Sequence, residues 1–253
     1  MKDEKGRTIR GPLPADEFKI LVDLFYEIYN DWGFKKDIRV FQSGCGCFGT
    51  PYDDYNREFS RILRERGIGI WQWGGWPRET IVNDGTIYVN TVSGAPFLNW
   101  NEYSVDPSIL HDCFVQNGKL LFSSNICGHL ANFVQVQPEK NFDYTKAWID
   151  YFRRVCSHFG VVLARDNEES ASQAVYSTHA KIDVIDGGYH IDLAPVDAIR
   201  TPLVEDHFYV SLREKALPRE VIGGKAYVKD CRSDHVVYVI ERDKDASSVD
   251  ILF

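Results

Sequence analysis

Residues 52–75 read YDDYNREFSRILRERGIGIWQWGG, a helical pattern followed directly by a strand-like one. In the first part, four apolar side chains recur at the spacing of one helix face: Tyr55, Phe59, Ile62 and Leu63. The second part, IGIWQWGG, reads as a buried strand that ends in glycines. A helix and a strand joined by so short a link are typical of an α/β unit with parallel strands.

The flanking segments continue this alternation. PADEFKILVDLFYEIYNDWGF (14–34) has helical spacing, with a start near Asp16 and an end near Gly33. Further strands are predicted at 37–44, 85–94, 119–129 and 161–165, and further helices at 107–118, 142–160 and 166–180. The predicted fold class is therefore α/β, with a parallel-stranded (β/α) barrel or an incomplete barrel.

The pattern changes after residue 180. KIDVIDGGYHIDLAPV (181–196) forms two alternating runs around Asp186-Gly187-Gly188, which is typical of a hairpin. Alternating runs separated by turn residues then continue to the end of the sequence. We predict two domains, a barrel-like α/β domain over 1–180 and a β-rich module over 181–253.

Composition excludes several classes of partner. The net charge of −8 over 253 residues argues against nucleic acid, because binding to phosphates relies on clustered Lys and Arg. No apolar run approaches the roughly 20 residues that cross a bilayer, and the first residues lack the apolar core of a signal peptide. Six cysteines are too few for a disulfide scaffold. We expect a cytoplasmic protein with no membrane or nucleic-acid partner.

Three thiols and an imidazole follow two of the predicted strands. Cys45 and Cys47 come after the strand at 37–44, and Cys127 and His129 end the strand at 119–129. The carboxyl ends of parallel strands meet at one edge of a sheet, where ligand sites form. These four side chains could hold one divalent metal ion, most readily zinc. Their C-x-C and C-x-H spacing is shorter than that of common structural zinc sites, and free cysteines are often simply buried.

Three tryptophans stand within the hexapeptide WQWGGW at 71–76. Indole faces stack on the apolar faces of sugar rings, so a glycan is the predicted substrate. The side chains that would form this surface are Trp71, Trp73, Trp76, Trp100 and Tyr88. The alternative is that one of Trp71 and Trp73 packs in the core while the other lies at the rim.

Two acidic pairs stand at predicted helix starts. Asp53 and Asp54 precede the helix of residues 52–67, and Glu168 and Glu169 begin the helix of residues 166–180. Adjacent carboxylates can bind a metal or share a proton, and Asp54 is a candidate catalytic residue on that ground. Asp and Glu at a helix start also cap the helix and complement its dipole, with Asp166 or Asn167 as the second cap.

Three stretches carry a resemblance to a known family. Residues 18–70, 119–133 and 142–175 resemble the middle and late parts of polysaccharide deacetylases of the NodB type, including a late strand that delivers a histidine. The resemblance implies a metal-dependent deacetylase of an N-acetylated glycan, with His129 as the catalytic acid. Cys45 and Cys47 would line the loop that faces it.

The chain departs from that family at the metal motif. The family binds its metal through an Asp and two His in a His-x-x-x-His phrase, whereas the first histidine of this chain is His111 and no such phrase occurs. A non-catalytic glycan-binding or assembly module and a structural-zinc protein therefore stand beside the deacetylase as hypotheses. A homo-oligomer is possible, because exposed edge strands often pair with another copy.

Overall fold

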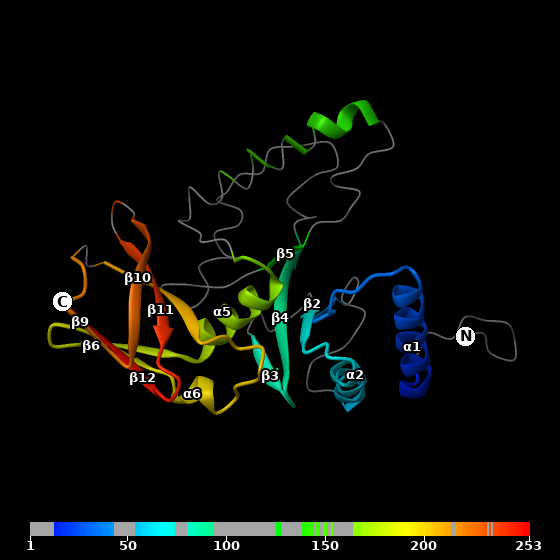
Figure 1. Ribbon diagram of the computed structural model, residues 1–253, viewed down its shortest axis with the longest axis horizontal. Coiled ribbons are helices and arrows are strands. Elements are labelled where there is room, and N and C mark those ends of the chain that lie inside the picture. Colours follow the sequence, from blue (N-terminus) through cyan, green and yellow to red (C-terminus); the bar gives the residue numbers. More distant parts are fainter. Residues whose placement is uncertain are drawn as a thin grey trace, which may run out of the picture.

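The computed structural model describes most of the amino-terminal helices and nearly all of the carboxyl-terminal half. The described residues are 13–42, 54–73, 80–93, 125–127, 138–143, 145–146, 149–150, 153, 164–213, 216–231, 233 and 235–253. Figure 1 shows the arrangement of the elements within these ranges.

The amino-terminal half begins as the sequence predicts. Helix α1 spans Ala15–Asp31, strand β1 Val40–Gln42, helix α2 Asp54–Glu65 and strand β2 Ile70–Trp73. β1 and β2 pair in parallel, with Val40 opposite Ile70. The predicted α/β unit with parallel strands is therefore confirmed for β1, α2 and β2.

The next strands interrupt that pattern. Strand β3 (Ile81–Asn83) and strand β4 (Thr86–Ser93) form an antiparallel hairpin. Asp84 and Gly85 both have positive φ, 47° and 76°, as a two-residue hairpin turn of type I′ requires. β4 also pairs in parallel with β2 and with β5 (Asn125–Cys127), so the sheet is mixed.

The predicted parallel (β/α) barrel is wrong. The described strands form one open mixed sheet, in the order β1-β2-β4-β3 with β5 on β4, and two antiparallel sheets. The physical reason lies at Asp84-Gly85, where a tight turn sends β4 back along β3 instead of through a crossover helix. The sequence TIVNDGTIYV contains this Asp-Gly turn signal between two strand-like runs. The strand predicted at 85–94 covers only the second run.

The carboxyl-terminal half follows its predicted pattern more closely. Helix α5 spans Asn167–His179, and strands β6 (Lys181–Ile185) and β7 (Gly188–Asp192) form the predicted hairpin, with Ile185 opposite Gly188. A short helix, α6 (Ala194–Asp197), follows and was not predicted. Within the helix predicted at 142–160, residues 142–143, 145–146, 149–150 and 153 are described and are helical, after the short 3-10 helix η6 (Pro138–Lys140).

Two antiparallel sheets complete the fold. One has the order β10-β11-β8 and the other the order β6-β7-β12-β9. The remaining strands are β8 (His207–Leu212), β9 (Glu220–Ile222), β10 (Gly224–Cys231), β11 (Val236–Arg242) and β12 (Ser248–Leu252). All of the pairings within these two sheets are antiparallel.

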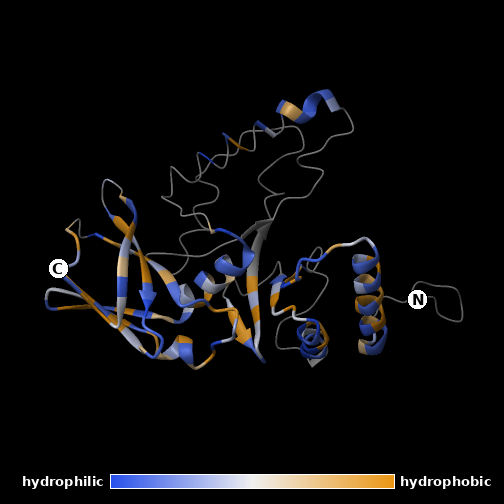
Figure 2. Ribbon diagram, viewed as in Figure 1, coloured by the Kyte–Doolittle hydropathy of each residue, from blue (hydrophilic) through white to orange (hydrophobic). Residues whose placement is uncertain are grey.

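The mixed sheet is covered on both faces. On one face Trp71 and Tyr88 pack against α1 and α2, where Phe18 stacks on Phe59 with ring centroids 4.0 Å apart. On the other face, alternate residues of β2 and β4 join α5 and the two antiparallel sheets in a larger core: Ile70, Ile87 and Val89. Figures 1 and 2 show these apolar segments between the helices on one side of β4 and the carboxyl-terminal sheets on the other.

The larger core contains residues from both sides of position 180. Ile87 and Val175 lie in the same buried cluster as Ile191 and Ile251. The division into two domains, 1–180 and 181–253, therefore stays a prediction. The described residues on the two sides of position 180 share one hydrophobic core. None of the described helices combines the length and the apolarity that a membrane span needs.

Candidate metal site between α5 and β8

Two of the predicted sugar-stacking residues lie in the core. Trp71 and Tyr88 are each 2% exposed, and their rings stack with centroids 5.6 Å apart. The edge of Phe41 meets Trp71, and the Tyr88 hydroxyl bonds to Ser60. Neither ring offers a face to a ligand, because period-two alternation turns both toward α1 and α2. The alternative of core packing therefore holds for Trp71.

The other predicted site residues lie at or beyond the limits of the described chain. Asp54 begins α2, Trp73 ends β2 and Cys127 ends β5, but their side chains are outside what the structure describes. Cys45, Cys47, Trp76, Trp100 and His129 lie outside the described residues altogether. The thiol and imidazole metal site, the catalytic roles of His129 and Asp54, and the remaining tryptophan surface stay predictions.

The start of α5 holds the first member of a different site. Asp166 caps the helix and accepts a hydrogen bond from the Glu169 amide at 2.9 Å, as the sequence predicts. The Glu169 side chain turns back over the same end and accepts a hydrogen bond from the Arg165 amide. This reciprocal arrangement resembles a capping box and fixes the position of the Glu169 carboxylate.

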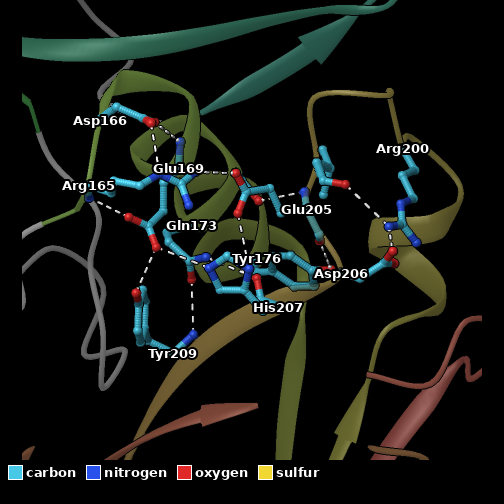
Figure 3. A network of polar contacts seen from close by, with 12 residues as sticks. Arg165, Asp166, Glu169, Gln173, Tyr176, Arg200, Glu205, Asp206, His207 and Tyr209 are labelled. Atoms are coloured by element: carbon cyan, nitrogen blue, oxygen red, sulfur yellow. Dashed lines mark hydrogen bonds and ion pairs between the residues drawn. The ribbon is translucent and has the colours of Figure 1, made fainter. Parts of the chain in front are cut away.

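Further along α5, side chains bond to the backbone of residues 205–209. The Gln173 amide donates to the His207 carbonyl and accepts from the Tyr209 amide, both at 3.0 Å. The Tyr176 hydroxyl donates to the Glu205 carbonyl at 2.7 Å, and Ser172 accepts from the Glu205 amide. Helix side chains thus take the place of a neighbouring strand along the β8 edge, and they set the register between the two elements (Figure 3).

That register brings Glu169, Glu205 and His207 together. His207 lies between the two carboxylates, with Nε2 3.1 Å from Oε1 of Glu169 and Nδ1 3.0 Å from Oε2 of Glu205. One ligand atom from each of the three residues lies within 4.8 Å of the other two. Figure 3 shows the three side chains converging from α5 and from the start of β8. This group could hold a metal ion.

The group is partly buried and rich in negative charge. The Glu169 side chain is 5% exposed, whereas those of His207 and Glu205 are 23% and 28% exposed. The carboxylates of Asp166, Glu169 and Glu205 face one guanidinium, that of Arg165, which contacts Asp166 at 2.9 Å and Glu205 at 2.8 Å. Negative charge exceeds positive charge here while His207 is neutral.

Hydrogen bonds keep Glu169 ionised. Burial alone would raise the pKa of Glu169, but the donors that face its carboxylate outweigh burial and hold the pKa below its ordinary value. These donors are the Arg165 amide, the Tyr209 hydroxyl and the His207 ring. Burial and the hydrogen bond to Glu169 raise the pKa of Tyr209 to about 12. At neutral pH the site therefore contains a carboxylate and a protonated phenol.

The sequence contains a local signal for part of this site. In EDHFY at 205–209, Glu205, His207 and Tyr209 stand two residues apart, and β8 itself begins at His207, so an extended segment leading into the strand would direct all three toward one face. For Glu169 the sequence leaves open whether the residue binds a metal with Glu168 or complements the helix start, and it indicates no partner elsewhere in the chain. The distance of 38 residues between Glu169 and His207 leaves no local pattern that joins the two.

Comparisons of the chain with protein-family models, with curated proteins and with solved structures found no match.

Proposed function

We propose that this protein binds a divalent metal ion through Glu169, Glu205 and His207 and acts as a metal-dependent hydrolase. The observation that carries the proposal is the convergence of one imidazole and two carboxylates from separate elements, with ligand atoms within 4.8 Å of one another. Imidazole nitrogen and carboxylate oxygen are ligands that Zn²⁺ and related divalent ions accept together.

The spacing of the ligand atoms supports this assignment. Two ligand atoms that each lie about 2.1 Å from an ion, at angles of roughly 90–110°, are about 3.0–3.4 Å apart. Nε2 of His207 lies 3.1 Å from Oε1 of Glu169, which is the spacing of two ligands on one ion, whereas Glu205 faces the other ring nitrogen, Nδ1, at 3.0 Å. An ion at Nε2 could thus lie between His207 and Glu169, and a movement of the Glu205 side chain would bring the third ligand to it.

The charge of the site and the hydrogen bonds to the Glu169 carboxylate also support a metal ion. A divalent cation would balance the excess of carboxylates over guanidinium groups that surrounds His207. The Glu169 carboxylate already accepts hydrogen bonds from the Tyr209 hydroxyl at 2.7 Å and from the Arg165 amide, which would orient it toward an ion. Such outer contacts are typical of metal ligands.

Three protein ligands leave room for water and substrate. An ion held by Glu169, Glu205 and His207 would supply Lewis-acid chemistry, which activates water for hydrolysis. Deacetylation of an N-acetylated glycan, which the sequence resemblance suggests, is a reaction of this kind. It stays a proposal, and the metal site supplies a direct way to test it.

The test measures binding of Zn²⁺ and Mn²⁺ to the full chain by titration calorimetry, and the shift in melting temperature, after treatment with chelator. The test variants are Glu169→Gln and His207→Gln, which keep similar size. The control variant is Asp250→Asn, because Asp250 lies 2.5 Å from His190 in a carboxylate–histidine pair that has no third ligand nearby within the described part of the chain.

We expect one ion per chain in the wild type and in the control, and loss of at least tenfold in affinity in both test variants. An ion at 100 times its dissociation constant should stabilise the wild type by about 2.7 kcal/mol. Equal affinity in wild type and His207→Gln would contradict the proposed ligands. Release of acetate from N-acetylated oligosaccharides by the metal-loaded wild type, lost in Glu169→Gln, would establish the hydrolase.

A further inference from the structure

Strand β6 forms an open edge of its sheet. Among the described strands, it pairs with β7 alone, in a regular ladder from Lys181 opposite Asp192 to Ile185 opposite Gly188. All five residues of β6 are exposed, and Val184 is 81% exposed. An exposed edge strand presents backbone groups on which another strand can pair.

The ladder determines which backbone groups point outward. A two-residue hairpin loop is closed by a hydrogen-bonded pair, here Ile185 and Gly188, and such pairs alternate along an antiparallel ladder. Lys181, Asp183 and Ile185 therefore bond to β7. The amide and carbonyl groups of Ile182 and Val184 point away from the sheet, toward the open edge.

The apolar side chains of the same two residues lack cover. Ile182 lies opposite Ile191, which is fully buried in the core, so the two share the inner face of the sheet. Ile182 is nevertheless 41% exposed, and the inner face of β6 therefore extends beyond the elements that cover β7. Burying Ile182 and Val184 would remove apolar surface from water.

Other edges of the two antiparallel sheets are protected. β10 carries a bulge between Val228 and Asp230 and two lysines, which discourage pairing. The edge of β8 bonds to the Gln173 side chain. β9 is only three residues long. β6 carries one lysine, Lys181, but among the described residues it has neither a bulge nor a covering side chain, and its ladder is regular over five residues.

We propose that two copies of this chain join through antiparallel pairing of their β6 strands, with Ile182 opposite Ile182 of the second copy. In this register the outward backbone groups of Ile182 meet each other, and the Val184 amide meets the Ala180 carbonyl, because the Ala180 amide already donates to the Tyr176 carbonyl at 2.9 Å. On the outer face, Lys181 of each copy lies opposite Asp183 of the other, so both cross-strand pairs have opposite charges. A register shifted to place Asp183 opposite Asp183 would oppose like charges.

The pairing is symmetric and closed. The twofold axis passes between the two Ile182 residues, so the two four-stranded sheets form one continuous eight-stranded sheet. Both cores lie on the same face, and the exposed Ile182 and Val184 side chains of each copy cover those of the other. The assembly leaves β6 without an open edge.

The test is a charge exchange followed by sedimentation analysis of the full chain at about 1–100 µM. We expect a dimer for the wild type. In Asp183→Lys, each cross-strand pair would place a lysine opposite Lys181, and the dimer dissociation constant should rise at least tenfold. In Lys181→Asp, each pair would place two carboxylates opposite each other, and the dissociation constant should rise by a similar factor. The double variant Lys181→Asp with Asp183→Lys should restore the wild-type constant.

A second measurement fixes the register and does not depend on affinity. Opposed residues of a hydrogen-bonded pair have Cα atoms about 5.5 Å apart, within the range that a disulfide spans. Ile182→Cys should therefore form a cross-linked dimer under mild oxidation, and Glu220→Cys on β9 serves as the control. A wild type that stays monomeric at the highest concentration overturns the proposal, and so does a dimer that neither charge variant weakens.

Discussion

The Tyr209 hydroxyl lies 2.7 Å from Oε1 of Glu169, and this contact joins strand β8 to the first turn of helix α5. This contact couples the ionisation of the two groups. The phenol is held protonated, with a pKa of about 12, while the carboxylate is held ionised.

The raised pKa of Tyr209 predicts a loss of stability in alkali. The folded state favours the protonated phenol, so its contribution is complete below the ordinary pKa of 10.0 and is lost as the pH rises toward 12. Over this window, the free energy of unfolding should fall more steeply with pH for the wild type than for Tyr209→Phe. Denaturant titrations at a series of pH values measure the difference, and parallel curves would contradict it.

The lowered pKa of Glu169 predicts the opposite dependence in acid. An ionised carboxylate favoured by the fold contributes stability above its ordinary pKa of 4.5, and this contribution is lost as the pH falls through the lower folded value. Glu169→Gln cannot titrate, so its free energy of unfolding should depend less on pH from about 5 to about 3. Equal slopes for the wild type and Glu169→Gln would contradict this prediction.

Gln173 should be important for the order of the β8 edge. Gln173→Ala leaves the Tyr209 amide and the His207 carbonyl without their side-chain partner, at a cost of about 1–3 kcal/mol. The expected local effect is faster hydrogen exchange at the Tyr209 amide. Gln173→Glu keeps an acceptor for that amide and should protect it better than Gln173→Ala. Equal exchange in both variants would show that the edge does not depend on this contact.

Arg242 is a buried charged residue that forms an ion pair with α6. Its guanidinium contacts both oxygens of Asp197 on α6, at 2.7 Å and 3.1 Å, and its side chain is 3% exposed. Arg242→Met should lower the free energy of unfolding by about 1–3 kcal/mol, because it removes two hydrogen bonds to a carboxylate that is 33% exposed and keeps Arg200 at 3.9 Å. Arg61→Met removes exposed ion pairs to Glu58 and Glu65 and should cost less than about 1 kcal/mol.

Two turn glycines should differ in their tolerance of alanine. Gly187 and Gly223 both have positive φ, 72° and 79°, but a Cβ at Gly187 meets open space while one at Gly223 meets the Ser248 carbonyl. Gly187→Ala should cost about 1 kcal/mol from backbone strain alone. Gly223→Ala should cost about 3 kcal/mol, because overpacking adds to that strain. Urea unfolding of the two variants provides the comparison.

The sequence alone was sufficient for elements that depend on local chemistry. The apolar spacing of α1 and α2 matches their bounds, Asp166 caps α5, and Asp186-Gly187 turns the β6–β7 hairpin. Each of these features arises from residues a few positions apart, where helical period, capping and turn geometry act directly.

Only the tertiary structure decided how strands pair and which residues meet. The Asp84-Gly85 turn pairs β4 antiparallel to β3, and the expected barrel does not form. Trp71 and Tyr88 lie in the core because the sheet turns them toward α1 and α2. Glu169 and His207, 38 residues apart, meet because Gln173 and Tyr176 set the register of α5 along β8. Contacts of this kind depend on packing between elements, and no local pattern of residues encodes them.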